Sequence, residues 1–150
     1  MLSIVQFLAL VADSVPSYLP DNRVGLTLHF LLHGIHHYLP MDKYRLVMPP
    51  TLFIVLAYPW WKFAHTVFAW HWHIGTAVFC GAIAGYIMYD LTHYFLHHAR
   101  LPSFYQETKK WHMQHHFMDY ENGFGVTNRL WDVVFGTELT QPIPKIVRST

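Results

Sequence analysis

Two long apolar stretches with an aromatic-rich break between them dominate the pattern of hydrophobic and polar positions. Residues 51–89 carry a single charged side chain, Lys62, over about forty positions. That length is too great for one bilayer crossing and suits two helices of roughly twenty residues each. Tryptophan, tyrosine and histidine crowd residues 58–73, as is typical of a membrane–water interface. We therefore predict a transmembrane helical hairpin over about residues 48–92, with both open ends on the same side of the membrane.

Helices are also predicted on either side of this hairpin. Asp21 or Asn22 can cap a helix over about residues 23–38, and Pro40 stops it. After the hairpin, Pro102 breaks the chain ahead of another helical segment. The predicted fold class is all-α: an integral membrane protein with one transmembrane hairpin and a histidine-rich helical cap.

Composition supports a membrane protein of one domain. The chain has 150 residues, of which 53% are hydrophobic and only 13% charged. Its length predicts a single domain over residues 1–150. The net charge of +1 and the scattered Lys and Arg residues do not suggest a nucleic-acid-binding surface.

The basic residues near the open ends of the hairpin predict its orientation. They lie on the same side as the predicted histidine-rich cap, at Lys43, Arg45, Arg100, Lys109 and Lys110. By the positive-inside rule this side faces the cytosol.

Histidines carry the candidate chemistry. The HxxHH pattern occurs twice, in HGIHH and in HMQHH, and a further pair lies four residues apart just after the hairpin. At this histidine content one HxxHH is expected roughly 0.1 times per chain, so two copies are strong evidence of a common role. The candidate metal ligands are His33, His36, His37, His93, His97, His112, His115 and His116. The alternative is that these imidazoles are packed or interfacial side chains with hydrogen-bonded nitrogens.

Spacing and hairpin geometry together predict one site. Residues three and four apart share a helix face, so each group can aim its imidazoles at a common point. The hairpin returns the chain to the surface it left, which brings the groups before and after it together. Eight imidazoles exceed the needs of one tetrahedral zinc, which indicates two metals or an ion with more ligands. If the site oxidises its substrate, the metal should be iron, because zinc has no redox chemistry.

Other polar residues near these groups have secondary roles in this interpretation. Asp90 precedes His93 by three residues and could orient it by accepting a ring N–H, although a cap or interfacial charge is equally plausible. Tyr89 and His29 are further candidates for supporting contacts. His65, His71 and His73 fall at the far end of the hairpin, away from the proposed site.

Four segments carry a resemblance to a known family: HFLLHGIHHYLPMDKYRLVMPP, YDLTHYFLHH, WHMQHHF and GFGVTNRLWDVVFGT. Over roughly residues 18–139 the chain resembles the catalytic part of the fatty acid 2-hydroxylases. The resemblance implies that the eight histidines are ligands of a di-metal centre, with iron expected in the active enzyme and zinc possible in isolated protein. It also implies an endoplasmic-reticulum membrane enzyme that uses O2 to hydroxylate acyl chains of sphingolipids, with electrons from a cytochrome b5-type haem protein.

The beginning of the chain departs from the family pattern. Family members carry another histidine-bearing helix immediately upstream and usually a haem-binding domain before it, whereas residues 1–17 contain no histidine. We therefore expect the chain to be a partial hydroxylase domain, truncated at the N-terminus and without a cytochrome b5 domain.

Three functions are the main candidates that the sequence supports. The first is 2-hydroxylation of fatty acyl chains, and the second is a non-catalytic, metal-binding member of the same fold. The third is a sterol-modifying member of the wider hydroxylase and desaturase superfamily, against which the HGIHHYLPMDKYRLVMPP segment argues. A histidine-lined zinc transporter is a weaker alternative, because the histidines gather at helix ends on one side of the membrane.

Overall fold

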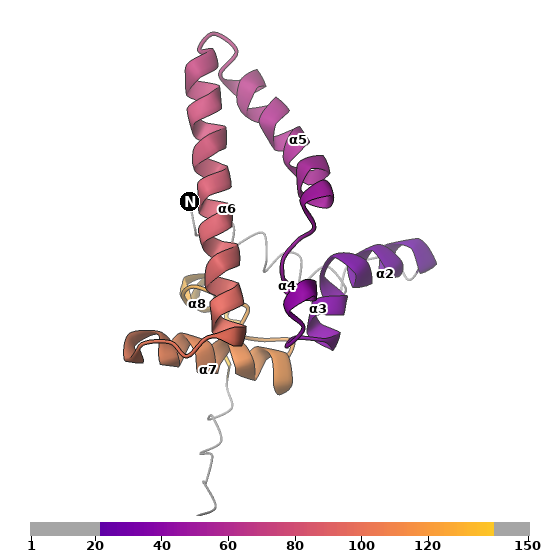
Figure 1. The fold of residues 1–150 in the computed structure, drawn as a ribbon, viewed down its shortest axis with the longest axis vertical. Coiled ribbons are helices and arrows are strands. Elements are labelled where there is room, and N and C mark those ends of the chain that lie inside the picture. Colours follow the sequence, from indigo (N-terminus) through magenta and orange to yellow (C-terminus); the bar gives the residue numbers. More distant parts are fainter. Residues whose placement is uncertain (1–21, 140–150) are drawn as a thin grey trace, which may run out of the picture.

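The computed structural model describes residues 22–139, and all regular structure in this range is helical. This agrees with the all-α prediction. In chain order the elements are α2 (Arg23–His29), η2 (Phe30–Gly34), α3 (Ile35–Tyr38), α4 (Lys43–Leu46), α5 (Pro50–Val67), α6 (Trp72–His98), α7 (Ser103–Phe117) and α8 (Leu130–Phe135). In Figure 1, α5 and α6 rise together from a base formed by the other helices.

The first helical stretch runs almost as the sequence predicts. Asn22 caps it, because its side-chain oxygen accepts the Gly25 N–H at 2.7 Å. The stretch is not one regular α-helix, since the π-turn η2 interrupts it between α2 and α3. Single π-turns inside helices are frequent at functional sites, and this one carries His33.

The hairpin consists of α5 and α6, joined over residues 68–71 within the predicted break. The rings of Phe53 and Tyr86 stack with centroids 5.0 Å apart near its open end. Gly75 lets the two backbones approach closely near the turn, because a Cβ there would lie 3.3 Å from the Ala64 carbonyl oxygen. The two helices therefore touch near the turn and again at Phe53 and Tyr86, although their axes diverge toward the base in Figure 1.

Within the described residues, α6 is the one helix both long and apolar enough to cross a bilayer. Its 27 residues span about 40 Å, against about 30 Å for the hydrocarbon core of a bilayer. A helix of this length that crossed a bilayer would leave roughly two turns outside the core, and His93 and His97 lie in its last two turns. The 18-residue α5 carries Lys62 and an internal Pro59, and its crossing of the membrane stays a prediction.

The base is held together by contacts between α7 and its neighbours. In Figure 1, α7 crosses below the end of α6. Lys109 Nζ donates to the Ala99 carbonyl oxygen at 2.8 Å. The Arg129 guanidinium lies 4.3 Å from the Trp111 ring centroid and pairs with Glu107, which ties the segment before α8 to α7. The buried centre of this base is mainly polar: His36, His93, His97, His112, Gln114, His115, His116 and Asp132.

Candidate metal centre

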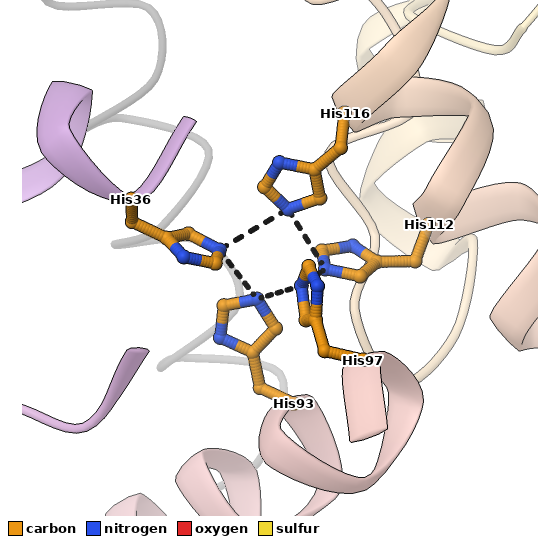
Figure 2. A group of neighbouring side chains, drawn as sticks. All are labelled: His36, His93, His97, His112 and His116. Carbon is orange, nitrogen blue, oxygen red and sulfur yellow. Dashed lines mark hydrogen bonds between the residues drawn. The ribbon is translucent and has the colours of Figure 1, made fainter. Parts of the chain in front are cut away.

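Five histidines from three helices converge at the base of the hairpin. His36 comes from α3, His93 and His97 from α6, and His112 and His116 from α7 (Figure 2). Each side chain contributes one ring nitrogen, and these five nitrogens all lie within 4.8 Å of one another. All five residues are buried.

The Nε2 atoms of these residues form a closed ring. The successive distances are 3.2 Å for His36–His93, 3.2 Å for His93–His97, 2.9 Å for His97–His112, 3.1 Å for His112–His116 and 3.2 Å for His116–His36. We call this group the five-imidazole ring.

Protons alone cannot satisfy this ring. A neutral imidazole nitrogen carries either a hydrogen or a lone pair, and a hydrogen bond needs one of each. Donors and acceptors cannot alternate around a ring of five, so at least one neighbouring pair must be mismatched. A cation at the centre removes the conflict, because all five nitrogens can then point lone pairs inward.

The charge state of the ring also suits a cation. Burial, and after it the neighbouring imidazole of His93, hold the pKa of His112 well below its ordinary value. Burial and the nearby rings, His37 first among them, likewise lower the pKa of His116. Both side chains are therefore neutral at pH 7 and have a lone pair to offer.

The spacing of the ring is that of ligands around one ion. With metal–nitrogen bonds of about 2.1 Å, ligands 90° apart are separated by about 3.0 Å. The neighbouring Nε2 atoms are 2.9–3.2 Å apart. The widest separation of 4.8 Å exceeds the span of about 4.2 Å across such a coordination shell, so the ring must contract by a few tenths of an ångström for all five to bind.

The three remaining predicted ligands form a second group beside the ring. The Nε2 atoms of His33 and His37 are 2.8 Å apart. The ring of His37 lies 5.0 Å from that of His115 and 4.5 Å from that of His116, measured between centroids. The structure thus brings all eight predicted histidines together, as a ring of five with three neighbours.

Local helix geometry explains this division. His33 and His37 are four residues apart and so share one helix face, while His36 points toward the ring. The π-turn ends at Gly34, where a Cβ would lie 3.2 Å from the Phe30 ring. The sequence predicts that the imidazoles of HGIHH point to one place. In the structure His36 points into the five-imidazole ring, and His33 and His37 point to a place beside it.

The orientation of His115 is set by a backbone group that sequence reasoning missed. Its Nδ1 lies 2.8 Å from the Asn122 carbonyl oxygen, and since a carbonyl only accepts, Nδ1 carries the hydrogen. In the neutral ring Nε2 then has the lone pair that can bind a metal. No residue-type pattern could have indicated this contact, because any residue at position 122 would supply a carbonyl.

Sequence reasoning also missed the role of Asp132. This side chain is fully buried and accepts hydrogen bonds from the loop that follows Asn122. Burial raises the pKa of its carboxyl above 3.8, because loss of water outweighs the hydrogen bonds that favour the charged form. The only available signal was its place in the GFGVTNRLWDVVFGT segment.

The candidates for supporting contacts lie beside the site. Tyr89 has its ring 6.0 Å from that of His93, and the ring of His29 is 6.3 Å from that of His33. Asp90 lines a cavity that also reaches His93. His65 lies at the far end of the hairpin, where its Nε2 is 3.2 Å from Thr76 Oγ1.

That cavity opens at the base of the hairpin and has a volume of about 210 Å³. Its lining includes the polar side chains of Arg45, Tyr89 and Asp90, and His36 and His93 connect it to the five-imidazole ring. The apolar residues of its lining are Leu31, Ile35, Leu46, Val47, Met48, Pro49 and Leu52.

The fold and the site define a helical protein with a histidine-lined candidate metal centre at the base of an apolar hairpin. A family model described as fatty acid hydroxylase matches residues 22–137, and the chain belongs to that family.

Curated relatives agree with this assignment. The chain is 55% identical to the ceramide very long chain fatty acid hydroxylase scs7 of Schizosaccharomyces pombe, over 81% of this chain and 35% of the relative. It is 45% identical to the dihydroceramide fatty acyl 2-hydroxylase FAH1 of Arabidopsis thaliana, over 81% and 51%. For the human fatty acid 2-hydroxylase the identity is 36%, over 78% and 32%. The chain thus spans about a third to a half of the length of these relatives.

A solved structure supports the fold. The structure titled "Full length scs7p (only hydroxylase domain visible)" matches with a TM-score of 0.85 and 45% identity, and the match covers 96% of this chain and 55% of that one.

Proposed function

We propose that this chain forms the catalytic part of a fatty acid 2-hydroxylase that acts on the acyl chains of sphingolipids. The observation that carries the proposal is the five-imidazole ring at the base of an apolar hairpin. The names of the relatives, which include ceramide and dihydroceramide hydroxylases, support the substrate class.

The reaction replaces one C–H bond next to the acyl carbonyl by C–OH. One oxygen atom of O2 enters the product and the other leaves as water, with two electrons and two protons supplied from outside. An iron pair bound by the histidines would activate O2, which the side chains of this protein cannot do alone. An all-histidine donor set also binds zinc, so isolated protein can carry that metal instead.

In this proposal the eight histidines bind two ions. The five-imidazole ring is proposed to hold one ion through Nε2 lone pairs. His33, His37 and His115 are proposed to contribute to a second ion beside it. His115 reaches that position with Nδ1 already engaged by the Asn122 carbonyl.

The cavity described above is the proposed route for the substrate. Its apolar lining residues, among them Val47, Pro49 and Leu52, suit an acyl chain that rises from the membrane beside α5. Its polar lining residues Tyr89 and Asp90 offer hydrogen-bonding groups to the carbonyl end of the chain. The reacting carbon would then face His36 and His93.

The proposed cellular setting follows the family. The protein would lie in the endoplasmic-reticulum membrane, with the metal centre on the cytosolic side, where Lys43, Arg45 and Lys109 are found. A cytochrome b5-type haem protein would deliver the electrons.

The relatives favour this function over modification of sterols, because those compared are all named as fatty acyl or ceramide hydroxylases. The non-catalytic alternative makes a different prediction, namely bound metal without product.

The test is to express the chain in cells without their own 2-hydroxylase and to supply ¹⁸O2. We expect sphingolipids whose acyl chains gain one ¹⁸O atom at the carbon next to the carbonyl. Unlabelled lipids from cells that contain folded, metal-loaded protein would refute stand-alone catalysis and favour the non-catalytic alternative.

A matched pair of variants links the product to the site. His93→Gln removes a member of the five-imidazole ring, whereas His73→Gln makes the same change at an exposed position near the hairpin turn. We expect His93→Gln to abolish labelled product and His73→Gln to leave it unchanged. Equal amounts of labelled product from both variants would show that the reaction does not need the five-imidazole ring.

A further inference from the structure

The segment after α7 is folded around the buried carboxylate of Asp132. Asp132 Oδ1 accepts the Phe124 N–H at 2.9 Å and the Thr137 hydroxyl at 3.1 Å, and Oδ2 accepts the Gly125 N–H at 3.0 Å. With 0% of its surface exposed, this side chain makes contacts that water cannot replace.

The surrounding backbone leaves little freedom. A Cβ at Gly125 would lie 2.3 Å from the Asn128 carbonyl oxygen and 2.6 Å from Asp132 Oδ2. The Gly123 N–H donates to the Thr137 carbonyl oxygen at 2.7 Å, which closes the loop at its other end. The peptide groups from 123 to 125 are therefore fixed from both sides.

This fixed loop contacts the candidate metal centre at His115. The carbonyl of Asn122, directly before Gly123, accepts the Nδ1–H of His115 at 2.8 Å. The Phe124 ring lies 5.3 Å from the His115 ring, between centroids. The Asn122 side chain is itself held, because its Nδ2 donates to both carboxylate oxygens of Asp119 at 3.1 and 3.0 Å.

We infer that Asp132 is a positioning residue for the metal centre, which acts through the Asn122 carbonyl to keep His115 in the tautomer that binds metal through Nε2. The chain of contacts runs from Asp132 to the N–H groups of Phe124 and Gly125, and from this loop to His115 Nδ1. This inference rests on the proposed function, in which His115 is a ligand of the second ion.

Asp132→Asn tests the inference with little change of shape. One carboxylate oxygen becomes an NH2 group, which cannot accept from a backbone N–H, so one of the two backbone bonds is lost. Glu138→Gln is the matched control, because it makes the same chemical change at an exposed position of the same segment.

The first measurement is the tautomer of His115, read from its ring ¹⁵N chemical shifts in metal-free, detergent-solubilised protein. We expect the Nδ1–H form in the unmodified chain and in Glu138→Gln, and a mixture of tautomers in Asp132→Asn. Metal plays no part in this readout, so it tests the inference even if the proposed function fails.

The second measurement is a titration with zinc, monitored by calorimetry. We expect Asp132→Asn to weaken binding of the second ion by about 10- to 100-fold, as changes around metal ligands typically do, while affinity at the five-imidazole ring is unchanged. If the unmodified chain takes up no zinc but the tautomer shift appears, the positioning role holds and the proposed function fails.

Two results would overturn the inference. One is an unchanged His115 tautomer with unchanged zinc affinity in Asp132→Asn. The other is an equal weakening of both ions with loss of helical signal, which would mean that Asp132 serves stability alone. Thr137→Val guards against failure to fold, since it removes the single hydroxyl bond to the Asp132 carboxylate, leaves both backbone N–H bonds to it in place, and should shift the tautomer in the same direction by less.

Discussion

Gly125 offers a sharp test of how tightly the segment after α7 is packed. In Gly125→Ala the new methyl group would lie 2.3 Å from the Asn128 carbonyl oxygen. Real Cβ atoms essentially never approach another heavy atom more closely than 3.0 Å. Backbone or the Asp132 carboxylate must therefore move by about 0.7 Å. The carboxylate is already held by three hydrogen bonds, so the change should cost about 1–3 kcal/mol, the usual range for overpacking.

The assay is thermal unfolding of detergent-solubilised protein, followed by circular dichroism. For a chain of this size about 1 kcal/mol corresponds to a shift of roughly 2–4 °C, so Gly125→Ala should melt about 2–12 °C lower.

Gly136→Asn is the control. Nothing lies within 4 Å of a Cβ at that position, and although its φ is +68°, asparagine tolerates the left-handed region better than other residues. We expect its melting point to stay close to that of the unmodified chain. If Gly125→Ala melted at the same temperature as the unmodified chain, the close packing around Asp132 would not exist and Asp132 could not hold the loop in place.

Two further predictions concern the core of the base. The low pKa values of His112 and His116 mean that the unfolded state takes up two protons below pH 6.5 that the folded state does not. The free energy of unfolding of metal-free protein should therefore decrease as pH falls below 6.5, by up to about 1.4 kcal/mol per pH unit for each histidine, and melting curves between pH 7.5 and 5.5 will measure it. A melting point independent of pH in this interval would show that these imidazoles are not held neutral. Leu96 is fully buried beside the ring, so Leu96→Ala should destabilise the protein by about 2–5 kcal/mol, whereas Phe95→Ala, which removes a 45% exposed side chain, should cost much less. Equal losses in melting temperature for the two variants would contradict this view of the core.

Local signals in the sequence were sufficient for most of the fold. The Asn22 cap, the stop at Pro40 and the break at residues 68–71 are short-range features, and the structure has each where the sequence predicts it. The convergence of the histidine groups could also be predicted, because a hairpin must return the chain to its starting side.

The sequence could not indicate what depends on backbone detail or on distant contacts. A π-turn over residues 30–34 has no residue signature, yet it accompanies the division of HGIHH between two groups. The contact from His115 to Asn122 uses a main-chain carbonyl. The role of Asp132 depends on a loop that folds back on it, and a carboxylate in an apolar segment could equally have been a surface charge.

The order in which the site can be built follows from the contacts of His36. Its ring meets His93, 57 residues later in the chain, and His116, 80 residues later. During synthesis from the N-terminus, His36 emerges first and has to wait for the whole hairpin and then for α7. The five-imidazole ring is therefore completed only after the hairpin has been made and placed, and no ion can be enclosed by all five side chains before that step. If the ring binds metal as proposed, loading of this chain is a late event, and a hairpin that failed to reach its place would leave a protein with all five histidines present and no centre.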